Sequence, residues 1–215
     1  MGVDLIKFIS VYRFIRINRF TLLNGKKIIS LLFFTLIARI SRRGIVEVGV
    51  YKGGASLLMS LVYGRKYREM QILIDPLSGH PSASVSKFDS LSHPPGHFSD
   101  TSLSIITELY AAQGFQLPTL IPLPIEETTL FADSSFIQNV GLVHLDTDLY
   151  LPTRFALSCL GALAPIGAII ILDDYGAPKC PGIEKAVGEF NAKFGAKFYS
   201  INWTKEQLIL IKKCN

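Results

Sequence analysis

From residue 44 onward, short apolar runs alternate with segments of helical length, and this alternation constrains the fold more than any other feature. The runs are GIVEVGV, MQILIDP, PTLIPLP, VGLVHLD and GAIIILDD, and PTRFALSCLGALAP forms one helix-length crossover between the last two. Strands that alternate with helices build parallel sheets covered by helices on both faces. We therefore predict one α/β domain over residues 44–215, with a mostly parallel, doubly wound sheet.

The end of the chain and one long loop complete this prediction. The last two apolar runs, AKFYSINW and EQLILIKK, are separated only by Thr204 and Lys205, which predicts a closing antiparallel hairpin. With 215 residues and 49% hydrophobic content, the chain can build a full core. Residues 75–100 form a polar loop that is too long for a simple connector, and such loops often act as lids or binding loops.

Residues 1–43 are predicted to be a basic, apolar, helical arm. They hold nine Lys and Arg against one Asp, whereas the rest of the chain holds 13 bases and 16 acids. A mildly acidic body argues against nucleic acid as a partner. The apolar stretch 28–38 is too short to span a bilayer, so we expect a helix packed on the domain. Residues 4–20 mix apolar and basic side chains as interfacial helices do, which leaves peripheral membrane contact or a dimer interface open.

The cysteines bear on the compartment. Cys159, Cys180 and Cys214 have neither metal-binding nor redox spacing. Free thiols without a disulfide framework are typical of a reducing environment. We therefore expect a cytoplasmic protein, with peripheral membrane association through the arm as the open alternative.

Two of the predicted strands each end in a pair of acids. Asp146 and Asp148 follow one strand, and Asp173 and Asp174 follow the next. Ligands bind at the carboxyl ends of parallel strands, and neighbouring strands lie about 4.8 Å apart. Carboxylates that converge there repel one another unless a cation lies among them, and all-oxygen ligation suits Mg²⁺. Taken singly, each acid could instead cap a helix or a loop.

The first strand and the turn after it suggest a nucleoside site. The segment EVGVYKGGAS opens a helix, and Gly49 and Gly53 allow a tight turn and close approach of the backbone to a ligand. The segment lacks the full dinucleotide fingerprint. Glu47 lies inside the strand, and Asp75 ends the second strand, where an acid commonly binds ribose hydroxyls. The alternative is that both are ordinary acids at strand ends.

Histidines and tyrosines near the acids are further candidates. His144 lies two residues before Asp146 and therefore on the same strand face, where it would contact substrate, support a metal ligand, or be a satisfied core histidine. Tyr150 and Tyr175 follow the acid pairs and are candidates for the wall of a substrate pocket. His93 and His97 flank Pro-Pro-Gly, which excludes a helical metal pair, so we predict that both are loop residues.

With these residues in place, the chain from about residue 44 to residue 213 resembles the macrocin-type O-methyltransferase family. The segments that carry the resemblance are GIVEVGVYKGGAS, LIDPLSGHP, GHFSDTS, VHLDTDLYLPT, ILDDYGAPKCPGIEKAVGEF and INWTKEQLILIKK. The resemblance implies a Rossmann-like class I methyltransferase fold, S-adenosylmethionine as cofactor and Mg²⁺ or a similar divalent cation. It also implies that Asp146, Asp173 and Asp174 bind the metal and that Asp148 is the general base.

The resemblance implies cofactor contacts as well, and these are Glu47, Gly49, Tyr51, Gly53, Ser56 and Asp75. Glu47 and the glycine turn would hold the amino-acid end of the cofactor, and Asp75 its ribose. The expected reaction is methyl transfer to a hydroxyl of a small sugar or aromatic molecule. Self-association through N-terminal helices is common in the family, so a homodimer is expected. Two alternatives stay open, namely a metal-dependent glycosyltransferase that uses Asp146-Thr147-Asp148 and a non-catalytic, membrane-associated scaffold.

Overall fold

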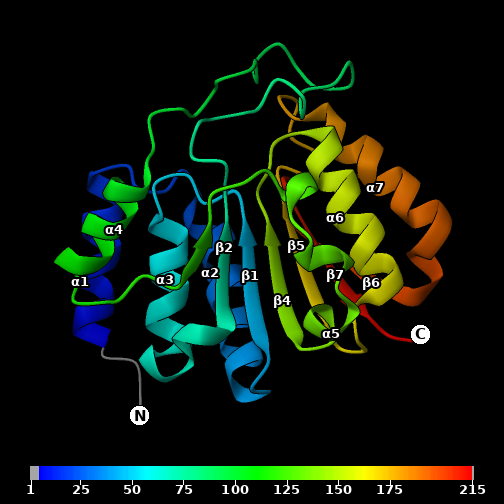
Figure 1. Ribbon diagram of the computed structural model, residues 1–215. Coiled ribbons are helices and arrows are strands. Elements are labelled where there is room, and N and C mark those ends of the chain that lie inside the picture. Colours follow the sequence, from blue (N-terminus) through cyan, green and yellow to red (C-terminus); the bar gives the residue numbers. More distant parts are fainter. Residues whose placement is uncertain (1–4, 215) are drawn as a thin grey trace.

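The computed structural model describes residues 5–214, so the first four residues of the predicted arm and Asn215 lie outside it. Its centre is a seven-stranded sheet of order β3-β2-β1-β4-β5-β7-β6 (Figure 1). The strands are β1 (Gly44–Val48), β2 (Gln71–Ile74), β3 (Thr119–Ile121), β4 (Val140–Leu145), β5 (Ile169–Asp173), β6 (Phe198–Thr204) and β7 (Gln207–Lys212). The first five strands pair in parallel, and β7 runs antiparallel to both β5 and β6. The predicted sheet and hairpin are confirmed, with Lys205 and Glu206 between the last two strands.

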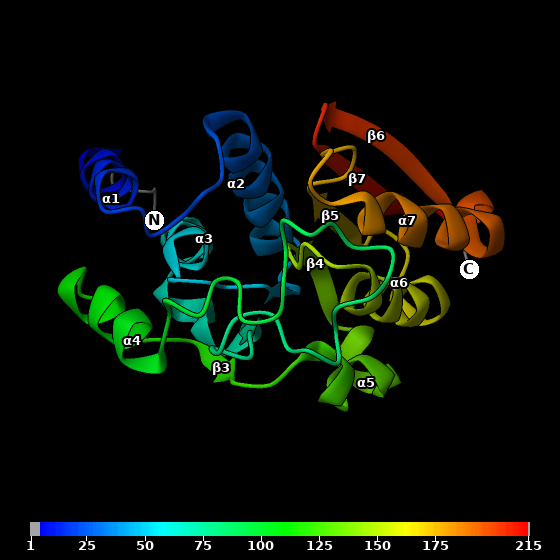
Figure 2. The same cartoon turned by 90° about the horizontal axis from the view of Figure 1, so that it is seen from above.

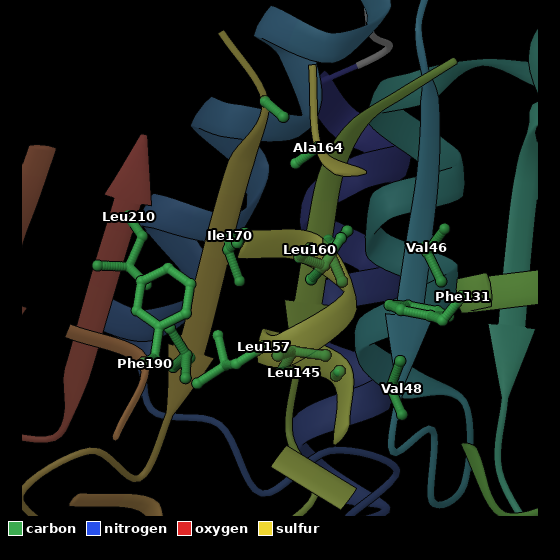
Figure 3. Packing of buried hydrophobic residues seen from close by; sticks show 14 of the residues in the cluster. Val46, Val48, Phe131, Leu145, Leu157, Leu160, Ala164, Ile170, Phe190 and Leu210 are labelled. Atoms are coloured by element: carbon green, nitrogen blue, oxygen red, sulfur yellow. The ribbon is translucent and has the colours of Figure 1, made fainter. Parts of the chain in front are cut away.

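Helices cover both faces of the sheet (Figures 1 and 2). One face carries α1 (Leu5–Ile17), α2 (Gly25–Ile40), α3 (Gly54–Tyr63) and α4 (Leu103–Ala112). The other carries α5 (Ser134–Ile137), α6 (Tyr150–Leu163) and α7 (Pro181–Phe194). Side chains alternate along each strand, so that Ile45 packs with the first group of helices and Val46 with the second. Figure 3 shows the second core, where Leu157 and Leu160 of α6 pack against the strands.

The apolar stretch of the arm is a helix packed on the domain, as expected. α2 spans Gly25–Ile40, and its Leu31 and Phe34 are buried in the same core as Ile45 of β1. Asn24 caps the helix by accepting hydrogen bonds from the backbone N–H groups of Lys26 and Lys27. None of the helices within residues 5–214 is long and apolar enough to cross a bilayer. Packing of α2 on the sheet brings the first turn of this helix close to the carboxyl end of β5.

The long polar loop follows β2 and contains no helix or strand before α4. It arches over the carboxyl ends of the parallel strands (Figure 1). Two backbone hydrogen bonds join its distant parts, because the His80 N–H donates to the His97 carbonyl at 2.9 Å and the Gly96 N–H donates to the His80 carbonyl at 2.9 Å. The loop therefore forms a cover over the edge where the acid pairs were predicted to meet.

Candidate active site

A cavity of about 720 Å³ lies at the carboxyl ends of β1, β2 and β4, under the long loop. Its volume is in the range of small-molecule sites. The predicted site residues on its wall are Glu47, Gly49, Tyr51, Asp75, Asp146, Asp148 and Asp174. The predicted residues that do not reach its wall are Gly53, Ser56, His144, Tyr150, Asp173 and Tyr175. The loop between α1 and α2 supplies a further wall, so the arm takes part in the site.

The four aspartates converge because β4 and β5 are neighbours, with Leu145 paired to Leu172. One carboxylate oxygen each of Asp146, Asp148 and Asp174 lies within 4.8 Å of the other two. One oxygen each of Asp146 and Asp173 also lie within 4.8 Å of each other. Asp148 and Asp174 have φ angles of +58° and +57°, in the left-handed region that costs most L-residues energy and that Asp tolerates better. Both residues adopt this conformation at the point where the carboxylates converge.

The electrostatics of the cluster favour a cation. Burial, and then the charges of Asp173 and Asp148, raise the pKa of Asp146 well above its usual range. Burial and the neighbouring Asp174 raise the pKa of Asp148 in the same direction. Both causes disfavour the ionised carboxylates, and a positive charge placed among them would remove this penalty.

One positive charge already lies there, and it comes from the arm. The Lys27 ammonium of α2 is 2.7 Å from Asp174 Oδ1 and 3.8 Å from Asp173 Oδ2. Burial alone would lower the pKa of Lys27, which is only 5% exposed, but Asp173 and Asp174 raise it above its ordinary value. Lys27 is therefore charged at neutral pH. Sequence reasoning missed this residue because nothing distinguishes it from the adjacent, exposed Lys26.

One carboxylate oxygen of Asp173 accepts a hydrogen bond, and the other has no hydrogen-bond partner within residues 5–214. Gln207 Nε2 donates to Asp173 Oδ1 at 2.6 Å, and Ser30 Oγ donates to Gln207 Oε1 at 2.5 Å. Asp173 Oδ2 is buried without a hydrogen-bond partner among residues 5–214, and the Lys27 ammonium is 3.8 Å away. A buried unpaired carboxylate oxygen is costly, so this atom fits the role of a metal ligand.

His144 connects the acid cluster to Glu47. Its Nδ1 is 3.0 Å from Glu47 Oε1, and its Nε2 is 3.8 Å from Asp173 Oδ2, too far for a hydrogen bond. Burial lowers the pKa of His144, but Asp173 and Glu47 together raise it to about 10. Ser56 donates a hydrogen bond to Glu47 Oε2. Since His144 and Ser56 are fully buried behind Glu47, they hold its carboxylate in place instead of contacting a ligand.

Asp75 and Gly49 lock the turn after β1. Asp75 Oδ2 accepts hydrogen bonds from the N–H groups of Val50 at 2.7 Å and Tyr51 at 2.9 Å, and Oδ1 accepts one from Leu77 at 2.7 Å. A carboxylate offers about four acceptor positions, which leaves room for a ribose hydroxyl. Gly49 has φ +86°, and a Cβ there would lie 1.8 Å from the Asp146 carbonyl oxygen. The glycine thus lets the turn approach the end of β4.

Neither of the two tyrosines lies on the cavity wall. Tyr150 donates a hydrogen bond from its hydroxyl to Glu189 at 2.9 Å, and its ring packs edge-on to Phe88 with centroids 4.8 Å apart. Tyr175 packs beside the small buried cluster that contains Cys180. These positions do not support the predicted role of both tyrosines in the wall of a substrate pocket.

Sequence reasoning also missed a group of histidines. His93 and His97 are loop residues, as predicted, but they lie beside His80, and all three are on the cavity wall. Cys180 Sγ is 3.5 Å from His93 Nε2 and 3.6 Å from Asp148 Oδ1. The presence of three histidines in a single long loop was the available signal.

One enzyme family matches most of this chain. The family described as Macrocin-O-methyltransferase (TylF) matches residues 36–204. Demethyldecarbamoylnovobiocin O-methyltransferase from Streptomyces niveus is 26% identical over 160 residues, which are 70% of this chain and 58% of that protein. This chain therefore spans a little over half the length of that curated relative.

Two solved structures share the fold. The O-methyltransferase NovP superposes with a TM-score of 0.74 at 20% identity, over 91% of this chain and 83% of that chain. CalS11, a calicheamicin methyltransferase, superposes with a TM-score of 0.64 at 18% identity, over 98% of this chain and 93% of that chain. The family match itself runs from within α2 to the end of β6 and includes the glycine turn and both acid pairs. By this match, the chain belongs to the macrocin O-methyltransferase family.

Proposed function

We propose that this chain transfers a methyl group from S-adenosylmethionine to a hydroxyl of a small sugar or aromatic molecule, with Mg²⁺ or a similar divalent cation. Membership of the macrocin O-methyltransferase family supports the reaction. The names of the novobiocin and calicheamicin enzymes support a natural-product acceptor. The observation that carries the metal requirement is the convergence of four carboxylates, in which the buried Asp173 Oδ2 has no hydrogen-bond partner.

The cofactor half of the proposed site is the turn after β1. Four of the predicted residues line the cavity there and would bind the cofactor, namely Glu47, Gly49, Tyr51 and Asp75. Gly53 and Ser56 are not on the cavity wall and would support these residues without touching the cofactor. Glu47 is suited to the amino group of the cofactor because His144 and Ser56 fix its carboxylate. Asp75 retains an acceptor position for a ribose hydroxyl after organising the turn.

The metal half is the junction of β4 and β5, where Asp146, Asp173 and Asp174 would hold the ion. A divalent cation at such a site polarises the acceptor hydroxyl and lowers its pKa. Asp148 lies on the cavity wall beside these residues and would accept the proton. Its place beside the proposed metal ligands Asp146 and Asp174 is the position that a general base would need. Lys27 would add a fixed positive charge that limits repulsion within the cluster.

The family match favours this function over the two alternatives that the sequence left open. A glycosyltransferase would use the Asp146-Thr147-Asp148 segment alone, whereas here Asp173 and Asp174 join the same cluster. A scaffold without activity would not need four converging carboxylates, one of them with a buried oxygen that has no hydrogen-bond partner.

The test combines binding and turnover. Calorimetry with S-adenosylhomocysteine and with UDP-sugars should show binding of the former alone. Transfer of a labelled methyl group to a panel of catechols and sugar diols should require Mg²⁺ and stop on chelation. Asp173→Asn should abolish metal-dependent transfer while S-adenosylhomocysteine still binds, and Glu69→Gln, whose side chain is 90% exposed, should change neither. Tight binding of UDP-sugars alone, or transfer that persists after chelation, would contradict the proposal.

A further inference from the structure

Three histidines of the long loop form a second group of possible metal ligands beside the carboxylate cluster. One ring nitrogen each of His80, His93 and His97 lies within 4.8 Å of the other two. Their ring centroids are 5.1 to 5.7 Å apart. His93 and His97 are separated by three residues, a spacing that recurs among zinc-binding histidine pairs.

The ring nitrogens in this group lack partners. The Nδ1 atoms of His80, His93 and His97 are all buried, and none has a hydrogen-bond partner within the described part of the chain. His93 is only 6% exposed. A buried polar atom without a hydrogen-bond partner destabilises the folded state, so three together require an explanation. A shared ligand would satisfy several of them at once.

The protonation state of the histidines also suits metal binding. Burial, and then the neighbouring His80 and His97, lower the pKa of His93 to about 4. Burial also lowers the pKa of His80 and of His97. At neutral pH the three imidazoles are therefore uncharged, and the neutral ring is the form that binds a metal ion.

We propose that His80, His93 and His97 bind a divalent ion of the Zn²⁺ type, distinct from the ion at the carboxylate cluster. Neutral imidazoles suit Zn²⁺ and its neighbours in the first transition series, whereas Mg²⁺ prefers carboxylate oxygens and water. Three protein ligands leave one position of a tetrahedral ion open. The two sites therefore select different metals by ligand chemistry.

The location of the histidine site gives the ion a role. Cys180 Sγ lies 3.5 Å from His93 Nε2, and Asp148 Oδ2 lies 3.6 Å from His80 Nε2, so the site adjoins the proposed base. All three histidines belong to the segment between β2 and α4, which contains no helix or strand. A metal that joins distant points of a long loop restricts its motion. Zn²⁺ would thus hold the cover in place over the side of the cavity where Asp148 lies.

The test measures zinc directly in the full chain. The protein is stripped with a chelator, equilibrated with Zn²⁺ in millimolar Mg²⁺ to fill the carboxylate cluster, and dialysed before its metal content is determined by mass spectrometry. We expect one Zn²⁺ per chain. His93→Gln combined with His97→Gln should reduce zinc to background, and Asp174→Asn, at the other cluster, should retain it.

X-ray absorption on the zinc-loaded wild type provides a readout that needs no variant, and it should show about three imidazole ligands on the ion. The proposal is overturned by wild-type protein that retains no zinc, by a folded double variant that retains it, or by an absorption spectrum dominated by carboxylate oxygens. Loss of zinc in Asp174→Asn would assign the ion to the carboxylates and overturn it too. None of these results depends on methyl transfer, so the proposed function is tested separately.

Discussion

Replacement of Lys27 by Met tests whether the acid cluster is a cation site, because the change removes one charge and keeps most of the unbranched apolar side chain. The Lys27 ammonium lies 2.7 Å from Asp174 Oδ1 and 3.8 Å from Asp173 Oδ2. In Lys27→Met the four aspartates lose this neighbouring cation. We therefore expect a protein that is less stable without metal and that binds a divalent ion more tightly.

The magnitudes follow from the burial of the pair. Breaking a buried ion pair by removing one partner costs about 3–5 kcal/mol, and we take the lower end because the Asp174 side chain is 24% exposed. A loss of about 3 kcal/mol corresponds to a fall of about 6–12 °C in the melting temperature of a chain of this size. At an effective dielectric constant of 20, a unit positive charge and a divalent ion about 5 Å apart repel each other by about 7 kcal/mol. Screening at Asp174 reduces this value, so we expect at least a roughly tenfold gain in metal affinity.

The assay is thermal unfolding in chelator and in saturating Mn²⁺, with calorimetric titration of Mn²⁺ into both proteins. Lys27→Met should melt well below the wild type in chelator and recover most of the difference in Mn²⁺. Lys26→Met is the matched control, because Lys26 is the preceding residue of α2 and its side chain is exposed. It should match the wild type in both measurements.

Two outcomes would refute this reasoning. Unchanged melting in chelator would mean that the Lys27 ion pair does not offset repulsion among the aspartates. Weaker Mn²⁺ binding in Lys27→Met would mean that the ammonium helps to form the metal site instead of competing with the ion.

Three further predictions concern the base, the glycine turn and the arm. Asp148→Asn should still bind Mn²⁺, more weakly because one negative charge near the ion is lost, and should lower the rate of methyl transfer at saturating Mn²⁺ by about 10²-fold or more; a fully active variant would show that Asp148 is not the base. Gly49→Ala should lower the free energy of unfolding in denaturant by several kcal/mol, because the new Cβ would overlap a carbonyl oxygen just past the end of β4. The control is Gly167→Ala, where φ is +81° but no atom lies within 4 Å of the new Cβ, and it should cost about 1 kcal/mol. We also expect a homodimer through the apolar face of α2, where Phe33 is 53% exposed. Phe33→Glu should then give monomers in light scattering. A wild-type monomer that sediments with liposomes would favour membrane contact instead.

The fold and the convergence of the acids could be predicted because both follow from local patterns. Alternating apolar runs predict parallel strands, and a single helix-length crossover between two strands places them side by side. Asp146 and Asp173 then meet because each lies at or just after the carboxyl end of its strand. The same reasoning correctly predicted that the stretch 28–38 packs as a helix.

The contacts that depend on tertiary packing could not be predicted. Lys27 lies 147 residues before Asp174, and only the packing of α2 on the sheet brings them together. His80 meets His93 through a loop without a repeating pattern. Tyr150 was predicted at the pocket because it follows an acid pair, but it begins α6, and the packing of that helix turns the side chain toward Glu189.

The most direct test of the central claim is a crystal structure of the chain with Mn²⁺ and S-adenosylhomocysteine, with data collected at the manganese absorption edge. The account predicts an anomalous peak in contact with Asp146, Asp173 and Asp174, and the nucleoside in the adjoining cavity beside Asp75. An anomalous peak at any other position, or a fully loaded crystal without one at these three carboxylates, would contradict it.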